Sequence, residues 1–207
     1  MSLFIILKKA KLIRNYFLIA LLYCSLYGCV SYSKKEFRKE YIKLNEHTLH
    51  MLNGKFKLYP VKRFQKETST DNCIRYTNLY QNIVDENWNS ERKADSLCTH
   101  NNTYSVALTF KDNKNLRIKL IENTTIIRDT TLSGKYKNGM FYLDNKDISI
   151  HGIPFLFGGY RSDKRRIGMT KDNNLIVNEA IGNEGAILLI LAAGYQYNAS
   201  YEYERIQ

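Results

Sequence analysis

Apolar and polar residues alternate along the C-terminal half of the chain. Between Tyr104 and Ile206, short alternating runs are separated by clusters of Asn, Asp, Gly and Lys. Alternation with a period of two is typical of an antiparallel strand with one buried and one wet face. It predicts about nine or ten short strands. The clearest of them are Tyr104–Phe110, Leu116–Ile121, Met140–Leu143 and Leu175–Ala180.

Turn residues separate these strands at short intervals. Asn138-Gly139 lies between two alternating runs, and Asn-Gly is the strongest short hairpin signal. Connections this short favour an up-and-down meander, in which consecutive strands pair. Further turns are predicted at Lys111–Asn115, Ser162–Asp163, Lys171–Asn174 and Gly182–Gly185.

Few stretches suggest a helix. We predict a short helix that ends near Leu52, before Asn53-Gly54, and one or two helical turns within Asn78–Val84. The apolar run Ala186–Leu191 is short and flanked by glycines, so it is predicted as a central strand. Strands do not alternate with helices, which excludes a doubly wound fold. The predicted class is all-β, an antiparallel up-and-down barrel with a short N-terminal helix.

The N-terminal segment has a different pattern. Four basic residues precede the apolar run Tyr16–Leu22, and Leu26-Tyr27-Gly28-Cys29 follows. The run is too short to span a bilayer but suits a secretory signal. Residues 1–28 carry four of the 31 basic residues and none of the 20 acidic ones. The formal net charge of +11 therefore overstates how basic the mature chain is.

The stretch Leu26–Cys29 resembles the lipobox of bacterial lipoproteins. The resemblance implies cleavage before Cys29 and its modification with fatty acids such as palmitate. More than one acyl chain makes anchoring stable, so the predicted partner is a membrane. The predicted location is the outer membrane of the Gram-negative envelope, where the periplasmic face is favoured over the cell surface, which stays the alternative. An ordinary signal peptide or an uncleaved anchor is the alternative. The predicted division is a signal peptide (1–28), a lipid-anchored tether (29–44) and one β-barrel domain (45–207).

Two cysteines, Cys73 and Cys98, remain once Cys24 is removed and Cys29 is lipidated. The envelope is oxidising, which favours a disulfide between them. The bridge would close a loop of about 25 residues and stabilise the fold by on the order of 3 kcal/mol. Two free or buried thiols are the alternative.

Three stretches of turn and strand pattern resemble lipocalin-like envelope lipoproteins. The resemblance implies a barrel and carries no catalytic residues. Known lipocalins open with Gly-x-Trp, whereas Gly54-Lys55-Phe56 stands here. The stretches are Leu52–Phe56, Ser133–Leu143, and Leu175–Asn178 together with Glu184–Leu189.

Four tyrosines recur with a period of two near the C-terminus and would line one face of a strand. An aromatic stripe at a barrel mouth is a candidate site for a small apolar or glycan-type ligand. Cross-strand packing is the other interpretation, and it stays open. The four residues are Tyr195, Tyr197, Tyr201 and Tyr203.

Other constellations are weaker. His47 and His50 share a helix face but lack a third ligand, so no metal site is predicted. Arg161 and Lys164–Arg166 flank a predicted turn, where they either bind an anion or discourage edge pairing. Two three-residue stretches, Asp95–Leu97 and Asp129–Thr131, resemble acceptor sites for bacterial O-glycans. Three pairs of carboxylates lie close together in the sequence, and they are Glu36/Glu40, Asp85/Glu86 and Glu202/Glu204.

No nucleophile elbow, phosphate loop or dinucleotide fingerprint is present in the sequence. We therefore predict a protein that is not an enzyme, has no cofactor and, being exported, does not bind nucleic acid. A barrel of eight or more strands has room for one small ligand. The predicted function is a binding module for a small apolar or glycan-type ligand. A structural or interaction lipoprotein, an accessory subunit of an outer-membrane assembly, is the alternative.

Overall fold

The computed structural model describes residues 14–16, 31–64, 78–84, 102–153, 157–187 and 191–206. The chain divides into two compact units, Met1–Val30 and Ser31–Gln207. In the first unit, residues 14–16 are helical. Among the described residues, no helix has both the length and the hydrophobicity needed to cross a membrane.

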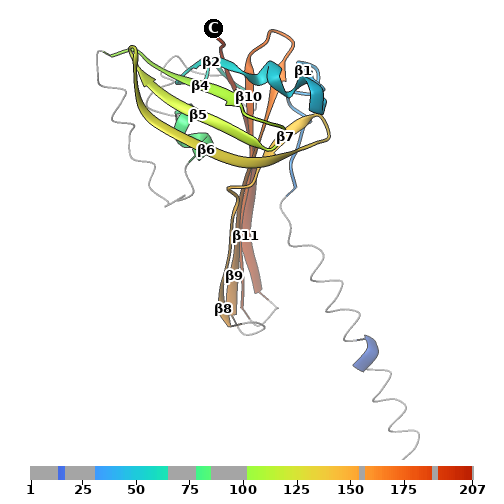
Figure 1. Ribbon diagram of the computed structural model, residues 1–207. Helices are drawn as coiled ribbons and strands as arrows, with labels where there is room; N and C mark the ends of the chain where they lie inside the picture. The colour runs from blue at the N-terminus through green and yellow to red at the C-terminus, as the bar shows by residue number, and fades with distance from the viewer. Residues whose placement is uncertain are drawn as a thin grey trace, which may run out of the picture. The chain divides into compact units, whose positions relative to one another are not determined.

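The second unit consists mostly of antiparallel strands, which confirms the predicted class. The strands follow the order β2-β4-β5-β6-β7-β9-β10-β11-β3, and β1 and β8 both pair with β9 (Figure 1). Most neighbours in the sheet are neighbours in sequence, as in an up-and-down meander. The elements are β1 (Tyr41–Ile42), η1 (a 3-10 helix, Glu46–Leu52), β2 (Gly54–Lys57), β3 (Lys62–Arg63), α3 (Leu79–Val84), β4 (Tyr104–Phe110), β5 (Asn115–Glu122), β6 (Thr125–Lys137), β7 (Met140–Leu143), β8 (Asp147–Ile153), β9 (Phe157–Thr170), β10 (Leu175–Ile187) and β11 (Leu191–Tyr203).

Asparagine and glycine make the tight turns that the sequence predicts. Asn138 and Gly139 have φ angles of 53° and 85°, so both central residues of the β6–β7 hairpin are left-handed. A two-residue hairpin of type I′ requires this geometry, and Lys137 pairs directly with Met140 across it. Asn173, in the predicted turn between β9 and β10, has a φ of 62°.

The sheet curls at Gly134, within β6. Before this residue β6 pairs with β5, and from Gly134 onward it pairs with β7. A Cβ at this position would lie 2.4 Å from the carbonyl oxygen of Tyr142 and 2.6 Å from ring atoms of Phe141. Glycine therefore permits the close approach through which β6 changes partners, and the sheet becomes a curled half-barrel (Figure 1).

Residues after β11 connect the two ends of the strand order. Phe56 in β2 and Arg205 form an isolated antiparallel bridge. The backbone N–H of Ile206 donates to the carbonyl oxygen of Lys55 at 2.8 Å. The Arg205 guanidinium lies 4.8 Å from the Phe56 ring centroid, over the same junction.

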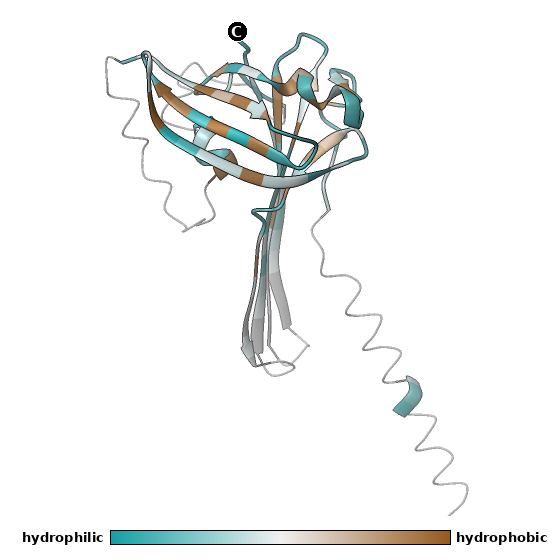
Figure 2. Cartoon of the chain, in the orientation of Figure 1, coloured by the Kyte–Doolittle hydropathy of each residue, from teal (hydrophilic) through white to brown (hydrophobic). Residues whose placement is uncertain are grey.

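Side chains fill the interior of the half-barrel. Phe110 and Phe141 meet edge to face, with ring centroids 4.8 Å apart. Hydrophobic and hydrophilic bands alternate along β5, as period-two patterning predicts (Figure 2). The interior is thus a packed hydrophobic core. Its larger members are Leu44, Leu49, Leu52, Phe56, Leu79, Ile83, Val106, Leu108, Leu116, Ile118, Phe141, Ile167, Met169, Leu175, Val177, Tyr201 and Tyr203.

Two of the predicted turns are wrong. Ser162–Asp163 and Gly182–Gly185 lie inside strands, and Ser162 pairs directly with Gly182. Pairing on both sides of β10 satisfies its backbone groups continuously, which overrides the local turn preference of Gly and Asn. The strand predicted at Ala186–Leu191 is also wrong as one element. Ala186 and Ile187 end β10, Leu191 begins β11, and residues 188–190 lie outside the described residues.

Strands β9, β10 and β11 are consequently 14, 13 and 13 residues long. Their inner halves belong to the half-barrel. Their outer halves continue with β8 as a four-stranded antiparallel ribbon (Figure 1). We call the paired residues 147–153, 157–163, 181–187 and 191–197 the outer ribbon.

The segment after Val30 packs against the sheet. Phe37 is fully buried and packs with Met140 and Ile176. The backbone N–H of Ser33 donates to Asn198 Oδ1 at 3.0 Å. Residues 31–44, predicted as part of the tether, thus belong to the folded unit from Ser31 onward. The predicted short helix is η1, whose first turn is closed by a capping box at Asn45.

Candidate functional site

The four tyrosines of the predicted stripe lie on one face of β11. Their cross-strand partners on β10 also lie on one strand face, and they are Leu175, Val177, Ile181 and Asn183. Burial divides the stripe. Tyr203 is 0% exposed and Tyr201 is 3% exposed, whereas Tyr195 is 55% exposed. The stripe therefore extends from the packed core to the solvent.

The inner two tyrosines are core residues. Both belong to the hydrophobic cluster of the half-barrel, and the Tyr203 hydroxyl accepts a hydrogen bond from Asn82 Nδ2 at 3.1 Å. A buried tyrosine needs such a partner for its polar end. For Tyr201 and Tyr203, the packing interpretation is the one that the structure supports.

The two middle tyrosines of the stripe, Tyr197 and Tyr201, lie beside a guanidinium. Arg63 Nη2 donates to the Tyr197 hydroxyl at 2.9 Å, and the hydroxyls of Tyr197 and Tyr201 are 3.2 Å apart. The guanidinium carbon is 5.7 Å from the ring centroids of both Tyr197 and Tyr201. Arg63 reaches this position because β3 pairs with β11. An exposed ring, a half-buried ring and a planar cation thus gather on one face.

Charged groups are buried next to this face. Arg165 Nη2 lies 2.9 Å from Asp163 Oδ2, and their side chains are only 4% and 1% exposed. Glu179 is 1% exposed and pairs directly with Arg165 in the register of β9 and β10. Buried charges need partners of opposite sign. Asp163, Arg165 and Glu179 therefore form a polar layer at the junction of the half-barrel and the outer ribbon.

The cationic site predicted around Ser162–Asp163 does not form as an exposed turn. Arg166 is on the opposite face of β9 from Arg165 and is 2% exposed. It donates to Asn178 Oδ1 at 2.6 Å and to the backbone oxygen of Ser33 at 2.9 Å, and its guanidinium lies 4.4 Å from the Tyr32 ring centroid. Burial lowers the pKa of Arg166, and burial, opposed by Arg166, raises the pKa of Tyr32. Arg166 thus holds the N-terminal segment.

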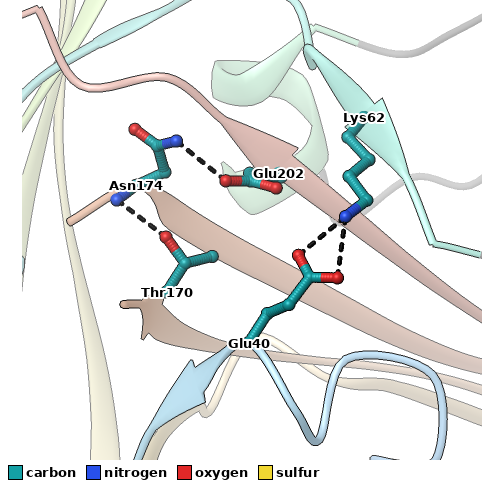
Figure 3. Close-up of polar contacts among 5 residues, drawn as sticks. All are labelled: Glu40, Lys62, Thr170, Asn174 and Glu202. Carbon is teal, nitrogen blue, oxygen red and sulfur yellow. Dashed lines mark hydrogen bonds and ion pairs between the residues drawn. The ribbon is translucent and has the colours of Figure 1, made fainter. Parts of the chain in front are cut away.

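The predicted pair Glu202/Glu204 makes separate structural contacts. Glu202 Oε1 accepts from Asn174 Nδ2 at 2.8 Å, and the Asn174 backbone N–H donates to Thr170 at the β9–β10 turn (Figure 3). Glu204 forms an exposed ion pair with Lys57 at 2.6 Å. Nearby, Glu40 accepts two hydrogen bonds from Lys62 Nζ (Figure 3). These contacts tie strands and turns together.

The remaining candidates add no site. The His50 ring contacts the His47 backbone oxygen at 2.7 Å, and no group of three or more His, Cys, Asp or Glu suits a metal among the residues that the structure describes. The Thr130 hydroxyl is 2.7 Å from that of Tyr80. Asp129 pairs with exposed Arg117. Cys29, Cys73, Cys98 and Asp95–Leu97 lie outside the described residues, so their predicted roles stay predictions.

Sequence reasoning missed the partners of the outer tyrosines. Arg63 comes from a weakly patterned region, and no local signal placed it against β11. Arg165 and Glu179 had a usable signal, because each lies two residues from an apolar core residue, Ile167 or Val177, on the same strand face. Because turns were predicted at Ser162 and Gly182, Arg165 and Glu179 were not assigned to the same strand face as the core residues.

Comparisons with protein-family models, with curated proteins and with solved structures each found no match.

Proposed function

We propose that this protein is a lipid-anchored, non-enzymatic envelope protein that binds a ligand at the solvent-exposed end of the tyrosine stripe on β11. The proposal rests on the difference in burial between the inner and outer tyrosines of the stripe. Its inner half is committed to the core, Tyr197 is half-buried at the edge of the core and accepts a hydrogen bond from Arg63, and Tyr195 is exposed on the same strand face. We call Arg63, Tyr195 and Tyr197 the tyrosine–arginine face.

The interior is a less suitable place for a ligand. Phe56, Phe141 and Tyr203 are fully buried among the aliphatic side chains of the half-barrel. Protein interiors of this kind are close-packed, and inserting further atoms displaces side chains at a cost of about 1–3 kcal/mol or more. The proposed binding surface is therefore the sheet face and not the lumen.

The chemistry of the tyrosine–arginine face favours a glycan-type ligand over a purely apolar one. Tyrosine rings offer flat apolar surfaces with a polar edge. Arg63 adds fixed N–H donors that match hydroxyl or carboxylate oxygens. A few polar groups set against aromatic surface are typical of small-ligand sites.

The anchor follows from the N-terminal sequence. Ser31 is two residues after Cys29, and its backbone oxygen accepts from Asn198 Nδ2 at 3.0 Å. Two residues span at most about 7 Å, so a lipidated Cys29 would hold the folded unit close to the bilayer. Replacing Cys29 with serine should release the protein from the membrane fraction, and continued retention would contradict lipid anchoring.

Binding is tested by titrating the purified protein with muropeptides and with oligosaccharides of the lipopolysaccharide core, followed by calorimetry. Tyr195→Ala, Tyr197→Ala and Arg63→Ala should each weaken binding about tenfold, equivalent to about 1.4 kcal/mol. Ile126→Ala is the matched control, since Ile126 is an exposed apolar residue on β6 (48% exposed). Saturable binding that none of the three substitutions weakens would overturn the proposed face.

A second function, a structural or interaction lipoprotein, is favoured by the same packed interior. A protein that acts by binding other proteins uses its surface and does not require an internal cavity. Crosslinking in intact cells followed by purification would recover a membrane-protein partner, with loss of the crosslink in surface variants of the outer ribbon. Glycan binding at the tyrosine–arginine face without any crosslinked partner would decide against it.

A further inference from the structure

Three segments that are distant in the sequence meet where the N-terminal part of the folded unit crosses the sheet. Strand β1 pairs with the end of β9. The Lys171 backbone N–H donates to the Glu40 carbonyl oxygen at 2.7 Å, and the Leu44 backbone N–H donates to the Gly139 carbonyl oxygen at 3.3 Å. Residues 31–44, the tip of the β6–β7 hairpin and the β9–β10 turn therefore adjoin one another.

These adjoining segments carry an excess of positive charge. Residues 31–44, 137–139 and 171–174 contain seven basic and three acidic residues. Residues 31–207 as a whole contain 27 basic and 20 acidic residues, because four of the 31 basic residues precede them. More than half of the net charge of the folded unit thus lies in three short segments. Six of the seven basic side chains are exposed, and we call them the basic patch: Lys35, Arg38, Lys39, Lys43, Lys137 and Lys171.

Ion pairs within the described part of the fold do not neutralise the basic patch. None of its side chains pairs with a carboxylate of another described residue, and Glu40 pairs with Lys62 instead. The remaining cation of these segments is Lys34, whose pKa is lowered by burial and then by the charges of Arg166 and Lys43. Cations crowded in this way create a positive potential that a partner of opposite sign stabilises.

We propose that the basic patch binds the anionic, phosphate-bearing headgroups of a lipid bilayer. The position of the patch in the chain supports this partner, in a step that rests on the proposed lipid anchor. Lys35 is six residues after Cys29, so its backbone lies within about 21 Å of an acylated cysteine. One lipid anchor holds a protein only weakly, and a polybasic patch is a second signal that makes the attachment stable.

The composition of the patch favours a bilayer over an acidic protein. Five of its six residues are lysines. Protein–protein interfaces are enriched in arginine and depleted in lysine. The lysine ammonium is a hydrated point charge on a flexible stem, which suits a fluid surface of many phosphates and needs no fixed bidentate geometry. Near an anionic bilayer, each such charge strengthens binding by a factor of about five.

The test measures how fast individual lysines of the full-length protein react with a water-soluble acylating ester, with mass spectrometry as the readout. The protein is bound to vesicles of phosphatidylcholine, with or without phosphatidylglycerol, and flotation selects the bound fraction. On vesicles with phosphatidylglycerol, labelling of Lys35, Lys39 and Lys171 should fall severalfold and should recover in about 0.5 M salt. Lys111 and Lys114, exposed in the β4–β5 turn, are internal controls whose labelling should not change.

Charge-reversal variants test whether the patch acts as one surface. Lys35→Glu combined with Lys39→Glu should restore most of the labelling of Lys171, because the patch then loses its excess of positive charge. Lys111→Glu combined with Lys114→Glu makes the same change in net charge elsewhere and should leave Lys171 protected. All four substituted side chains are exposed, and circular dichroism compares the folding of each variant with that of the parent.

Three outcomes would overturn the proposal. Patch lysines could label equally fast on both kinds of vesicle. Lys111 and Lys114 could be protected as strongly as the patch, which would indicate unspecific coverage. Protection could also occur only in native envelope membranes and not on protein-free vesicles, which would assign the patch to an acidic protein. Retention of Cys29→Ser in the membrane fraction would contradict the anchor but leave the labelling result standing, so the two proposals fail separately.

Discussion

The inner and outer halves of β9, β10 and β11 belong to the same strands and share an uninterrupted register, yet they differ in what surrounds them. The inner halves present Ile167, Val177 and Tyr201 to the packed core. The outer halves carry exposed positions such as Asn183 and Tyr195. The half-barrel gains from burial of these side chains, and in the outer ribbon such burial is seen at the end next to the half-barrel, at Ile181 and Asp163. Exposed positions such as Asn183 and Tyr195 therefore contribute little to the core.

The largest difference should appear when an aromatic residue is truncated in each half. Phe141 is fully buried and contacts Phe110, so Phe141→Ala should lower the free energy of unfolding by about 3–5 kcal/mol. Tyr195→Ala, on the exposed ribbon, should change it by less than about 0.5 kcal/mol. Urea unfolding monitored by circular dichroism measures both. Equal losses would show that the outer ribbon is part of the cooperative core.

Breaking the polar layer at the junction of the halves should have the next largest effect. Arg165→Met leaves Asp163 buried without its ion-pair partner and should cost about 3 kcal/mol. The exposed pair Arg117–Asp129 supplies the control, and Arg117→Met should leave the urea midpoint unchanged. The double variant Asp163→Leu/Arg165→Met should recover part of the loss. A double variant less stable than Arg165→Met would contradict the assigned pairing.

Replacing a glycine with alanine should have opposite effects on the free energy of unfolding in the two halves. At Gly134, a Cβ would collide with backbone at Tyr142 and with the Phe141 ring, so Gly134→Ala should cost about 1–3 kcal/mol. Gly194 is an exposed strand residue of the outer ribbon, and Gly194→Ala should be neutral or stabilise by about 0.5 kcal/mol. Thermal unfolding of both variants tests the sign of the difference.

The smallest effect should depend on pH and concern one turn of the half-barrel. Asp112 accepts hydrogen bonds from the Asn115 side chain and from the backbone N–H groups of Lys114 and Asn115, which lower its pKa below the ordinary range. The folded-state pKa is depressed, so the stabilisation is present above the ordinary pKa of aspartate. It is lost as pH falls from above the ordinary pKa of aspartate, about 3.9, through the lower folded value.

The measurement for Asp112 is the difference in unfolding free energy between the parent and Asp112→Asn across that pH range. The difference should shrink as pH falls. An NMR titration of the Asp112 carboxyl group should give a midpoint below that of an unstructured aspartate. A midpoint at or above the unstructured value would contradict the turn geometry.

Local patterns predicted the regular elements well where turn chemistry was unambiguous. Tyr104–Phe110 and Met140–Leu143 match β4 and β7 residue for residue, and Asn138-Gly139 makes the hairpin expected of it. The errors concentrate in the long strands. Gly182 and Asn183 read as a turn in isolation, but pairing on both flanks keeps them in β10. A local preference worth a fraction of a kcal/mol cannot outweigh two ladders of hydrogen bonds.

The sequence by itself determined the class of fold and the face on which the tyrosines lie, because period two is a property of any strand. Tertiary structure alone decided which tyrosines are buried. That depends on where the half-barrel ends along β11, and this boundary is set by Gly134, by β3 and by the bridge between Phe56 and Arg205. It also decided that Arg63 meets Tyr197. Contacts between segments that are far apart in the chain produce no periodic pattern in the sequence, so only the folded structure reveals them.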